Sequence, residues 1–167
     1  NQKSSVTNGR GQTTTFEYTP AGRPKVFNTP CGEVEFTYDA NGNIHTAEDN
    51  NGTVTRVYDK LNRLKQYTDT YGKTVSYDYD EVGNIIKITY PDTTEVTYTY
   101  DANNNITSVT DWAGRVTQYT YDENNNLKGV THANGCTATH TYDDKQRLTK
   151  TVEKTENGTI ITSFEYY

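Results

Sequence analysis

The 167-residue sequence has few of the residues that usually build a protein core. Leu, Ile, Val and Phe together number 27, there is no Met, and Trp112 is the only tryptophan. At such a low aliphatic content, intrinsic disorder becomes a serious alternative. Two observations oppose disorder: the net charge of -6 is modest for this length, and 15 tyrosines and 31 threonines favour strands. We therefore expect a folded chain that is almost wholly β.

The sequence also lacks basic runs and long apolar segments. An acidic balance without a cluster of Lys and Arg argues against nucleic acid or an anionic membrane as a partner. No apolar stretch reaches the length of a membrane span or of a signal-peptide core, so we expect no membrane span. The sequence starts without Met and stops inside a repeat. We interpret it as a piece of a longer protein whose localisation signals lie outside it.

What the sequence does contain is one arrangement that recurs along nearly its whole length. In residues 37–44 a Tyr-Asp pair is followed by turn residues and then by an aliphatic residue. The six Tyr-Asp pairs, spaced 20 or 21 residues apart, are Tyr38-Asp39, Tyr58-Asp59, Tyr79-Asp80, Tyr100-Asp101, Tyr121-Asp122 and Tyr142-Asp143. Degenerate copies surround Tyr18 and Tyr166. A fixed period of this size indicates a repeat protein.

Each repeat predicts one β-hairpin. The key tyrosine and the residues two and four before it alternate with polar residues, as in Val96, Tyr98 and Tyr100, which is typical of a strand with one buried face. The Asp after the tyrosine can accept hydrogen bonds from backbone amides two or three residues on. Asn or Gly at the fourth and fifth positions after the tyrosine tolerates the positive φ of a tight turn.

The second strand of each repeat begins at the sixth position after the tyrosine. A second apolar site follows three residues later, as in Ile106 and Val109, and another turn follows, as at Ala113-Gly114. Eight tyrosine positions then predict about 14 to 16 strands. A sheet of more than about ten strands seldom stays flat, because strand twist accumulates.

The predicted fold is therefore all-β: tandem antiparallel β-hairpins that form one long, curved or spiralling sheet, with aromatic residues stacked across consecutive hairpins. Residues 1–10 are expected to be a frayed lead-in or a remnant of a preceding repeat. Residues 11–167 are expected to hold seven to eight repeats of about 20 or 21 residues, the last one truncated.

The six Tyr-Asp pairs in register resemble the YD repeats of Rhs proteins, bacterial wall-associated proteins, insecticidal toxin complexes and teneurins. The family pattern is roughly Tyr-Asp-x-x-Gly-Arg-Leu-x-x-Val-Thr, and the resemblance covers residues 11–167. This sequence departs from the pattern where Asn replaces Gly or Arg, as at Asn104-Asn105 and Asn125-Asn126. Its last unit also carries about three extra residues around 153–157.

The resemblance implies a structural role. The repeats would form part of a β-shell in a secreted or cell-surface bacterial protein, which encapsulates or presents a C-terminal effector, often a toxin. The partners would be the remaining repeats and the effector domain of the parent chain. Two unpaired sheet edges would also invite self-association. The alternative is a module of cell–cell contact that binds carbohydrate or a surface protein through its Tyr, Trp and Asn-rich turns.

We find no catalytic, cofactor or metal site in the sequence. The segments starting at Asp39, Asp101 and Asp122 imitate the beginning of an EF-hand loop, but Asn50, Trp112 and Ala133 stand where the twelfth position needs an acid. Turn chemistry is the simpler interpretation. The three histidines, His45, His132 and His140, are dispersed over different repeats. His140 stands two before a key tyrosine, where packing is expected, and enzymatic activity is not expected.

Trp112 is the one candidate ligand contact, because a partly exposed aromatic ring in a turn can stack on a sugar ring. The simpler interpretation is that it covers the sheet edge or touches a neighbouring turn. Cys31 and Cys136 lie in turns five repeats apart, roughly 48 Å along a flat strip. A disulfide needs Cα atoms within about 7 Å. We therefore expect two free thiols, with a cross-link between chains as the minority alternative.

Overall fold

The computed structural model describes residues 2–166, and within that range it contains strands and turns but no helix. The sixteen strands are β1 (Ser5–Thr7), β2 (Thr13–Tyr18), β3 (Pro24–Thr29), β4 (Gly32–Tyr38), β5 (Ile44–Asp49), β6 (Gly52–Tyr58), β7 (Leu64–Thr68), β8 (Thr74–Tyr79), β9 (Ile85–Thr89), β10 (Glu95–Tyr100), β11 (Ile106–Thr110), β12 (Val116–Tyr121), β13 (Leu127–Thr131), β14 (Thr137–Tyr142), β15 (Leu148–Lys154) and β16 (Ile160–Glu165). Among the described residues there is accordingly no helix that could cross a membrane.

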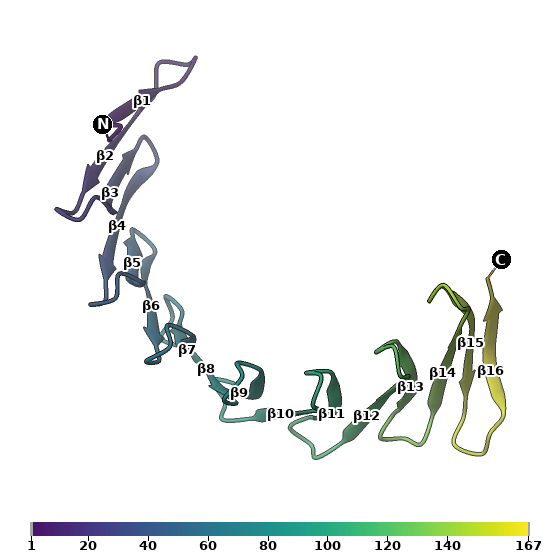
Figure 1. Cartoon of the computed structure of the whole chain (residues 1–167). Helices are drawn as coiled ribbons and strands as arrows, with labels where there is room; N and C mark the ends of the chain where they lie inside the picture. Colours follow the sequence, from purple (N-terminus) through teal and green to yellow (C-terminus); the bar gives the residue numbers. More distant parts are fainter. Residues whose placement is uncertain (1, 167) are drawn as a thin grey trace. The chain divides into compact units, whose positions relative to one another are not determined.

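Strand order in the sheet follows the sequence from β1 to β16 (Figure 1). Every register that the structure gives is antiparallel, as in the pairing of Tyr98 with Val109. The prediction of an all-β fold of tandem antiparallel hairpins in a single sheet is confirmed. The chain divides into two compact units, which we describe separately: unit 1 holds residues 2–77 and Tyr90–Asp92, and unit 2 holds Asp78–Thr89 and residues 93–166.

Aromatic side chains stack across consecutive hairpins in unit 1, as the sequence predicts. The ring of Phe27 lies 5.2 Å from that of Phe16 and 5.3 Å from that of Phe36, both in edge-to-face geometry. Phe16 and Phe27 are also directly paired across β2 and β3. Such cross-strand aromatic pairs are the units that stabilise a sheet.

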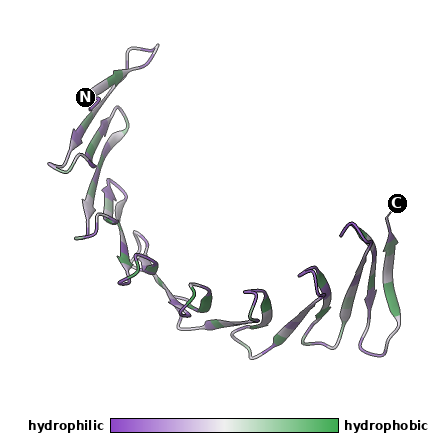
Figure 2. Cartoon of the chain, viewed as in Figure 1, coloured by the Kyte–Doolittle hydropathy of each residue, from purple (hydrophilic) through white to green (hydrophobic). Residues whose placement is uncertain are grey.

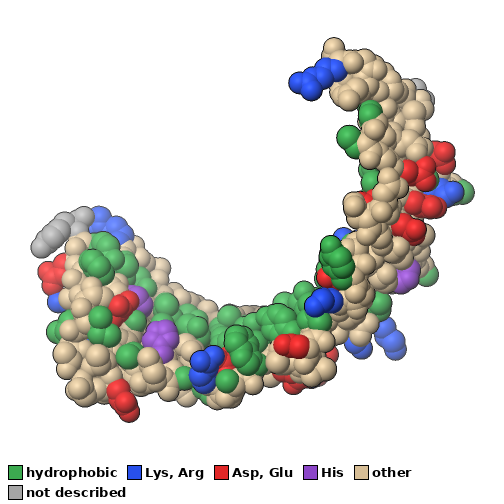
Figure 3. Space-filling view, turned by 180° about the vertical axis from the view of Figure 1, so that it is seen from behind, with side chains coloured by type: hydrophobic (Ala, Val, Ile, Leu, Met, Phe, Trp, Pro, Cys, Tyr) green, Lys and Arg blue, Asp and Glu red, His purple; other side chains and the backbone are tan. Residues whose placement is uncertain are grey.

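The hydrophobic core is thin. Among the described residues only Val26 and Val96 are buried hydrophobic side chains, each 7% exposed. Hydrophobic residues lie mainly on the strands and hydrophilic residues on the turns (Figure 2). The space-filling view shows hydrophobic side chains open to the surface (Figure 3). A single layer of strands shields its apolar face only partly, so contacts between neighbouring hairpins must carry much of the stability.

A bulge explains a spacing that the sequence left unexplained. Residues three apart, such as Ile106 and Val109, should face opposite sides of a regular strand. The register shifts by one residue between Thr99 and Tyr100, so that Tyr100 pairs with Ile106 while Tyr98 pairs with Val109. The bulged residue returns both apolar positions to the face of the tyrosines. The same shift occurs beside Tyr18, Tyr38, Tyr58, Tyr121 and Tyr142.

The two ends of the repeat series differ from its middle. Part of the expected lead-in forms β1, which pairs with β2. The extra residues of the last unit lie in the longer strand β15 and the turn that follows it. A second bulge there, between Glu153 and Lys154, restores pairing with Ile160.

Candidate functional site

The repeated Tyr-Asp turn is the most regular local structure of the molecule. We number its five positions from the residue after the key tyrosine, so Asp39 is position 1 and Asn43 is position 5. The Asp39 N–H donates to the Asn43 carbonyl at 2.9 Å, and the Gly42 N–H donates to the Asp39 carbonyl at 3.0 Å. This is a type I turn followed by a residue in the left-handed region, a common hairpin connection.

Asn or Gly at positions 4 and 5 was predicted to tolerate a positive φ, and in the structure position 4 adopts it. The residues there are Gly22, Gly42, Asn62, Gly83, Asn104, Asn125 and Gln146, with φ between 61° and 106°. Position 5 has another task, because its N–H and its side chain both donate to the Asp. Asn105 donates from its N–H to Asp101 Oδ1 at 2.9 Å and from Nδ2 to Asp101 Oδ2 at 3.0 Å.

Within its own turn, Arg at position 5 does the same as Asn, because both present a side-chain N–H to the carboxylate. Arg63 donates from Nε to Asp59 Oδ2 at 2.7 Å, and Arg147 does the same to Asp143. The Asp also accepts the N–H of position 3, two residues on. The predicted Asx-type turn is present, and its Asp accepts from the N–H groups two and four residues on. Asp80 also accepts the N–H of Gly83, three residues on.

These hydrogen bonds lower the pKa of every Asp in the Tyr-Asp turns. The amide of the position 5 Asn is the main cause for the pKa of Asp39, Asp101 and Asp122. The backbone N–H of the position 5 Arg is the main cause for Asp59 and Asp143. Burial raises the pKa of Asp80, but its bonds to Asn84 and neighbouring amides outweigh that effect. The ionised carboxylate is therefore part of the folded turn.

The key tyrosines join each hairpin to the preceding one. The hydroxyls of Tyr100, Tyr121 and Tyr142 donate to the carbonyls of Ile85, Ile106 and Leu127 at 2.7, 3.0 and 2.9 Å. Each acceptor is the first residue of the second strand of the preceding repeat. Burial raises the pKa of Tyr100 and Tyr121, so the neutral hydroxyl is favoured in the fold. We call these bonds the tyrosine ties.

The turns that join one hairpin to the next, which we call opposite-edge turns, are less uniform. Asp111 begins one with the same geometry: its N–H donates to the Arg115 carbonyl, and its carboxylate accepts the N–H groups of Ala113 and Arg115. Others begin with residues as different as Asn8, His132 and Thr155. Two short turns instead place Gly32 and Gly52 at a positive φ.

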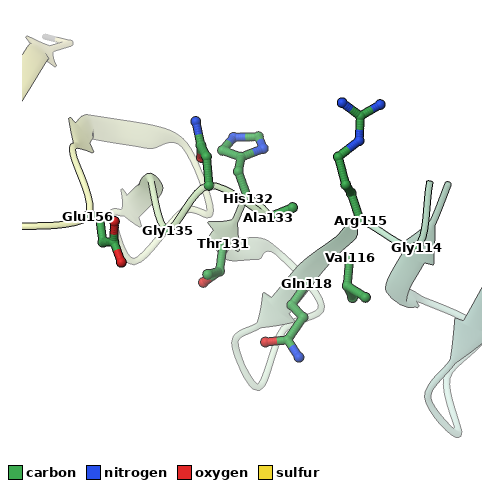
Figure 4. A pocket seen from close by; sticks show the side chains of 10 residues that line it. Gly114, Arg115, Val116, Gln118, Thr131, His132, Ala133, Gly135 and Glu156 are labelled. Atoms are coloured by element: carbon green, nitrogen blue, oxygen red, sulfur yellow. The ribbon is translucent and has the colours of Figure 1, made fainter.

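A groove of about 590 Å³ lies among three opposite-edge turns of unit 2 and is lined in part by Arg115, His132 and Glu156. In Figure 4 the side chains of Arg115 and His132 extend to one side of the ribbon, away from Gln118. Arg115 is already paired with Asp111 at 2.7 Å.

Trp112 is not among the residues that line this groove. Its side chain is 63% exposed, and the guanidinium of Arg115, in the same turn, lies 5.9 Å from the ring centre. The structure thus places the tryptophan against its own turn. Its role as a ligand contact stays a prediction.

The remaining predicted residues are not brought together into one site. His45 Nδ1 is bonded to the Arg56 carbonyl, and His140 Nδ1 to Thr151 Oγ1 at 3.0 Å. Cys31 and Cys136 are both free. Over residues 2–166, no group of three or more His, Cys, Asp or Glu side chains could hold a metal ion.

Contacts between successive Tyr-Asp turns were not predicted from the sequence. Asn105 Nδ2 and Asn103 Nδ2 donate to Asn125 Oδ1 of the next turn at 3.0 and 2.9 Å. In unit 1, Asn41 and Asn43 donate in the same way to Asn62 Oδ1, each at 2.9 Å. The fixed offset of about one period between these asparagines was the available signal.

Hairpins that repeat one turn and bond their neighbours through side chains define a structural β-repeat protein. Comparison with protein families makes this specific. The chain belongs to the teneurin YD-shell family, whose model matches residues 1–111, and the RHS repeat model matches residues 100–138 and 121–160. No curated protein matches the sequence.

Several solved structures share this fold. A Tc holotoxin pore of Photorhabdus luminescens matches with a TM-score of 0.74 and 18% identity over 92% of this chain and 9% of that chain. The TcdB2-TccC3 crystal structure matches with the same score and identity over 92% and 10%. Its complex with Cdc42 gives 0.73 and 16% over 92% and 9%. The chain therefore spans about a tenth of the length of these structures.

Proposed function

We propose that this chain is a wall segment of a YD-repeat shell in a larger bacterial protein that is secreted or displayed on the cell surface. The wall encapsulates or presents a C-terminal effector domain, and the segment's partners are that domain and the remaining repeats of the parent chain. In this proposal residues 1–10 lead into seven to eight repeats over residues 11–167. The Tyr-Asp pairs are the structural residues of each repeat.

The observation that carries the proposal is the chain of tyrosine ties. Each of Tyr100, Tyr121 and Tyr142 bonds the backbone of the preceding hairpin. This arrangement strengthens a single layer of strands without a deep core, which suits a wall better than a compact binding domain. Family membership supports the shell, and one matched structure is of TcdB2-TccC3 without its hypervariable C-terminal region. In that protein the C-terminal region is separable from the fold shared with this chain.

An enzymatic role is not part of the proposal. The carboxylates of the Tyr-Asp turns accept hydrogen bonds within their own turns, and Asp39 is engaged through both oxygens. These Asp residues therefore serve as turn acceptors and not as general acids or bases. The comparisons give no support to the alternative of a carbohydrate-binding or protein-binding module.

Limited proteolysis of the intact parent protein tests the wall. We expect the region C-terminal to these repeats to survive, as followed by mass spectrometry, under conditions that digest the same region expressed alone. A parent carrying Tyr121→Phe and Tyr142→Phe should lose part of this protection, whereas Tyr119→Phe should not, since no described residue hydrogen-bonds the Tyr119 hydroxyl. Equally rapid digestion of the region in the intact parent and alone would refute encapsulation.

Self-association through the sheet edges is a separate proposal for the isolated chain. β16 ends the strand order and carries Ile160, Ile161 and Phe164, which are 58%, 59% and 55% exposed. An apolar end strand readily pairs with another chain. We expect the mass measured by light scattering to rise with concentration, and less so for Ile161→Lys. A concentration-independent monomer would contradict this proposal and leave the shell proposal standing.

A further inference from the structure

The amide of a position 5 Asn serves two turns at once. Asn105 Nδ2 donates to Asp101 Oδ2 of its own turn and to Asn125 Oδ1 of the next. Asn84 Nδ2 likewise bonds Asp80 Oδ2 and Asn104 Oδ1, each at 2.9 Å. An amide nitrogen has two hydrogens, so both are used. The acceptor is in each case an Asn at position 4, held in the left-handed region.

A longer side chain at position 5 has a different neighbour. The guanidinium of Arg23 reaches over the next turn, where any Cβ at Gly42 would overlap it. Arg23 is held there by the ring of Tyr38, 5.7 Å away. A side chain at position 4 would displace the guanidinium from its place beside Tyr38, whereas φ alone would admit Asn.

The first hairpin shows the same arrangement with Gln2. The Tyr18 hydroxyl donates to the Lys3 carbonyl, which is the tyrosine tie, so Lys3 stands at the sixth position of a repeat and Gln2 at position 5. Gln2 Nε2 donates to the Gly22 carbonyl at 2.9 Å and would lie 2.7 Å from a Cβ at Gly22. Residues from Gln2 to β1 therefore have the geometry of the second half of a repeat.

The residue at position 5 of one turn correlates with the residue at position 4 of the next at every junction in the sequence. Position 5 of one turn and position 4 of the next are Gln2 and Gly22, Arg23 and Gly42, Asn43 and Asn62, Arg63 and Gly83, Asn84 and Asn104, Asn105 and Asn125, and Asn126 and Gln146. A long side chain precedes Gly, and Asn precedes a residue with a side-chain amide. Arg63 and Gly83 belong to different units, so this pair is a sequence observation only, and nothing lies within 4 Å of a Cβ placed at Gly83.

We infer that positions 5 and 4 of consecutive Tyr-Asp turns form a pairing rule that selects which hairpin stacks on which. A turn ending in Arg or Gln fits a hairpin with Gly at position 4, and a turn ending in Asn fits one with Asn. The Tyr-Asp edge is thus an interaction surface specific for another turn of matching kind. A hairpin that stacks on the Arg147 turn should carry Gly at position 4. This inference does not depend on the shell enclosing anything.

A double-mutant cycle in unit 2 tests the rule. Asn105→Arg alone places a guanidinium over Asn125, and Asn125→Gly alone removes the acceptor of two bonds. Each should lower the urea midpoint measured by circular dichroism. The double variant recreates the Arg and Gly junction and should recover most of the loss. We expect a coupling of about fivefold in the folding equilibrium constant, the size of one net hydrogen bond.

Gly114→Asn is the matched control for backbone strain. Gly114 lies in an opposite-edge turn of the same unit, with φ +75° and open space around the Cβ position. It reports the cost of Asn in place of Gly without a facing turn. If the effects of Asn105→Arg and Asn125→Gly simply add in the double variant, the two positions are not coupled and the rule is wrong.

A gain-of-stability variant provides an independent test. Gln146 has φ 61°, and no hydrogen bond of the described residues joins it to Asn126. Gln146→Asn should create the missing bond and raise the urea midpoint. The gain should shrink in an Asn126→Ser background, whereas an equal gain in both backgrounds would attribute it to φ alone and contradict the rule at this junction.

Discussion

The two rows of turns in this molecule use the same local geometry under different constraints. In the Tyr-Asp turns an Asp begins all six full copies, and Asn side chains bond successive turns. In the opposite-edge turns the first residue ranges from Asp111 to His132 and Thr155. The difference indicates that the type of turn alone does not restrict sequence. The Asp is required by the bonds within its own turn, and bonding between neighbouring turns further restricts the Asn positions.

Acid should act mainly on the Tyr-Asp row, and its effect on stability should exceed that of any single substitution. The pKa is lowered for all six Asp residues of this row and, in the other row, for Asp49 and Asp111. A lowered folded-state pKa contributes stability above the unfolded value of about 3.9 and loses it as pH falls through the folded value. The urea midpoint should therefore fall steeply below about pH 4.

Asp111→Asn serves as the control for that titration. It should leave most of the acid-induced loss in place, because the six carboxylates of the Tyr-Asp row remain. The raised pKa of Tyr100 and Tyr121 gives stability the opposite dependence on pH. Their contribution is complete below about pH 10 and is lost as pH rises through the folded value. A midpoint that stays constant on acidification would contradict the role given to the Asp turns.

Removing one tyrosine tie should cost about 1.5 kcal/mol, the upper end for a single neutral hydrogen bond, because the Ile85 carbonyl loses its donor. The variant is Tyr100→Phe, measured by urea unfolding. Tyr119→Phe also removes a hydroxyl from a tyrosine on the same face, and it should cost less. Equal losses in the two variants would mean that the rings, and not the hydroxyl groups, hold adjacent hairpins together.

An opposite-edge turn should be open to improvement. Thr93 adopts φ 68°, a conformation that is strained for a β-branched residue. Thr93→Gly should stabilise the chain by about 1 kcal/mol. Thermal unfolding would reveal the gain as a higher midpoint. Loss of stability would show that the Thr93 side chain contributes more than its backbone costs.

The smallest effect is expected at Trp112. Its exposed ring contacts Arg115 of its own turn, so Trp112→Ala should change stability by no more than about 0.5 kcal/mol. Arg115→Gln removes the same contact while keeping the ring and is the matched variant. A loss of more than about 2 kcal/mol on Trp112→Ala would assign the ring a structural role in this row.

The period and the strand alternation were enough to predict the hairpins, because residues such as Tyr98 and Tyr100 alternate with Thr97 and Thr99. The bulge was not predicted, although the three-residue step from Ile106 to Val109 required one. The role of position 5 was missed as well. In the sequence, Asn at this position indicates only a turn. Its second bond, to the Asn of the next turn, becomes evident only when successive turns are placed beside one another.

The junctions between Tyr-Asp turns also set which genetic rearrangements the repeats can tolerate. Loss of residues 101–121 would bring the turn of Asn125 directly after that of Asn84, an Asn junction of the kind already present. Loss of residues 39–58 would instead place Asn62 after Arg23, where a glycine is needed. Repeat arrays change length by recombination between similar segments of DNA. In this chain only some crossover points would leave a protein whose hairpins still stack.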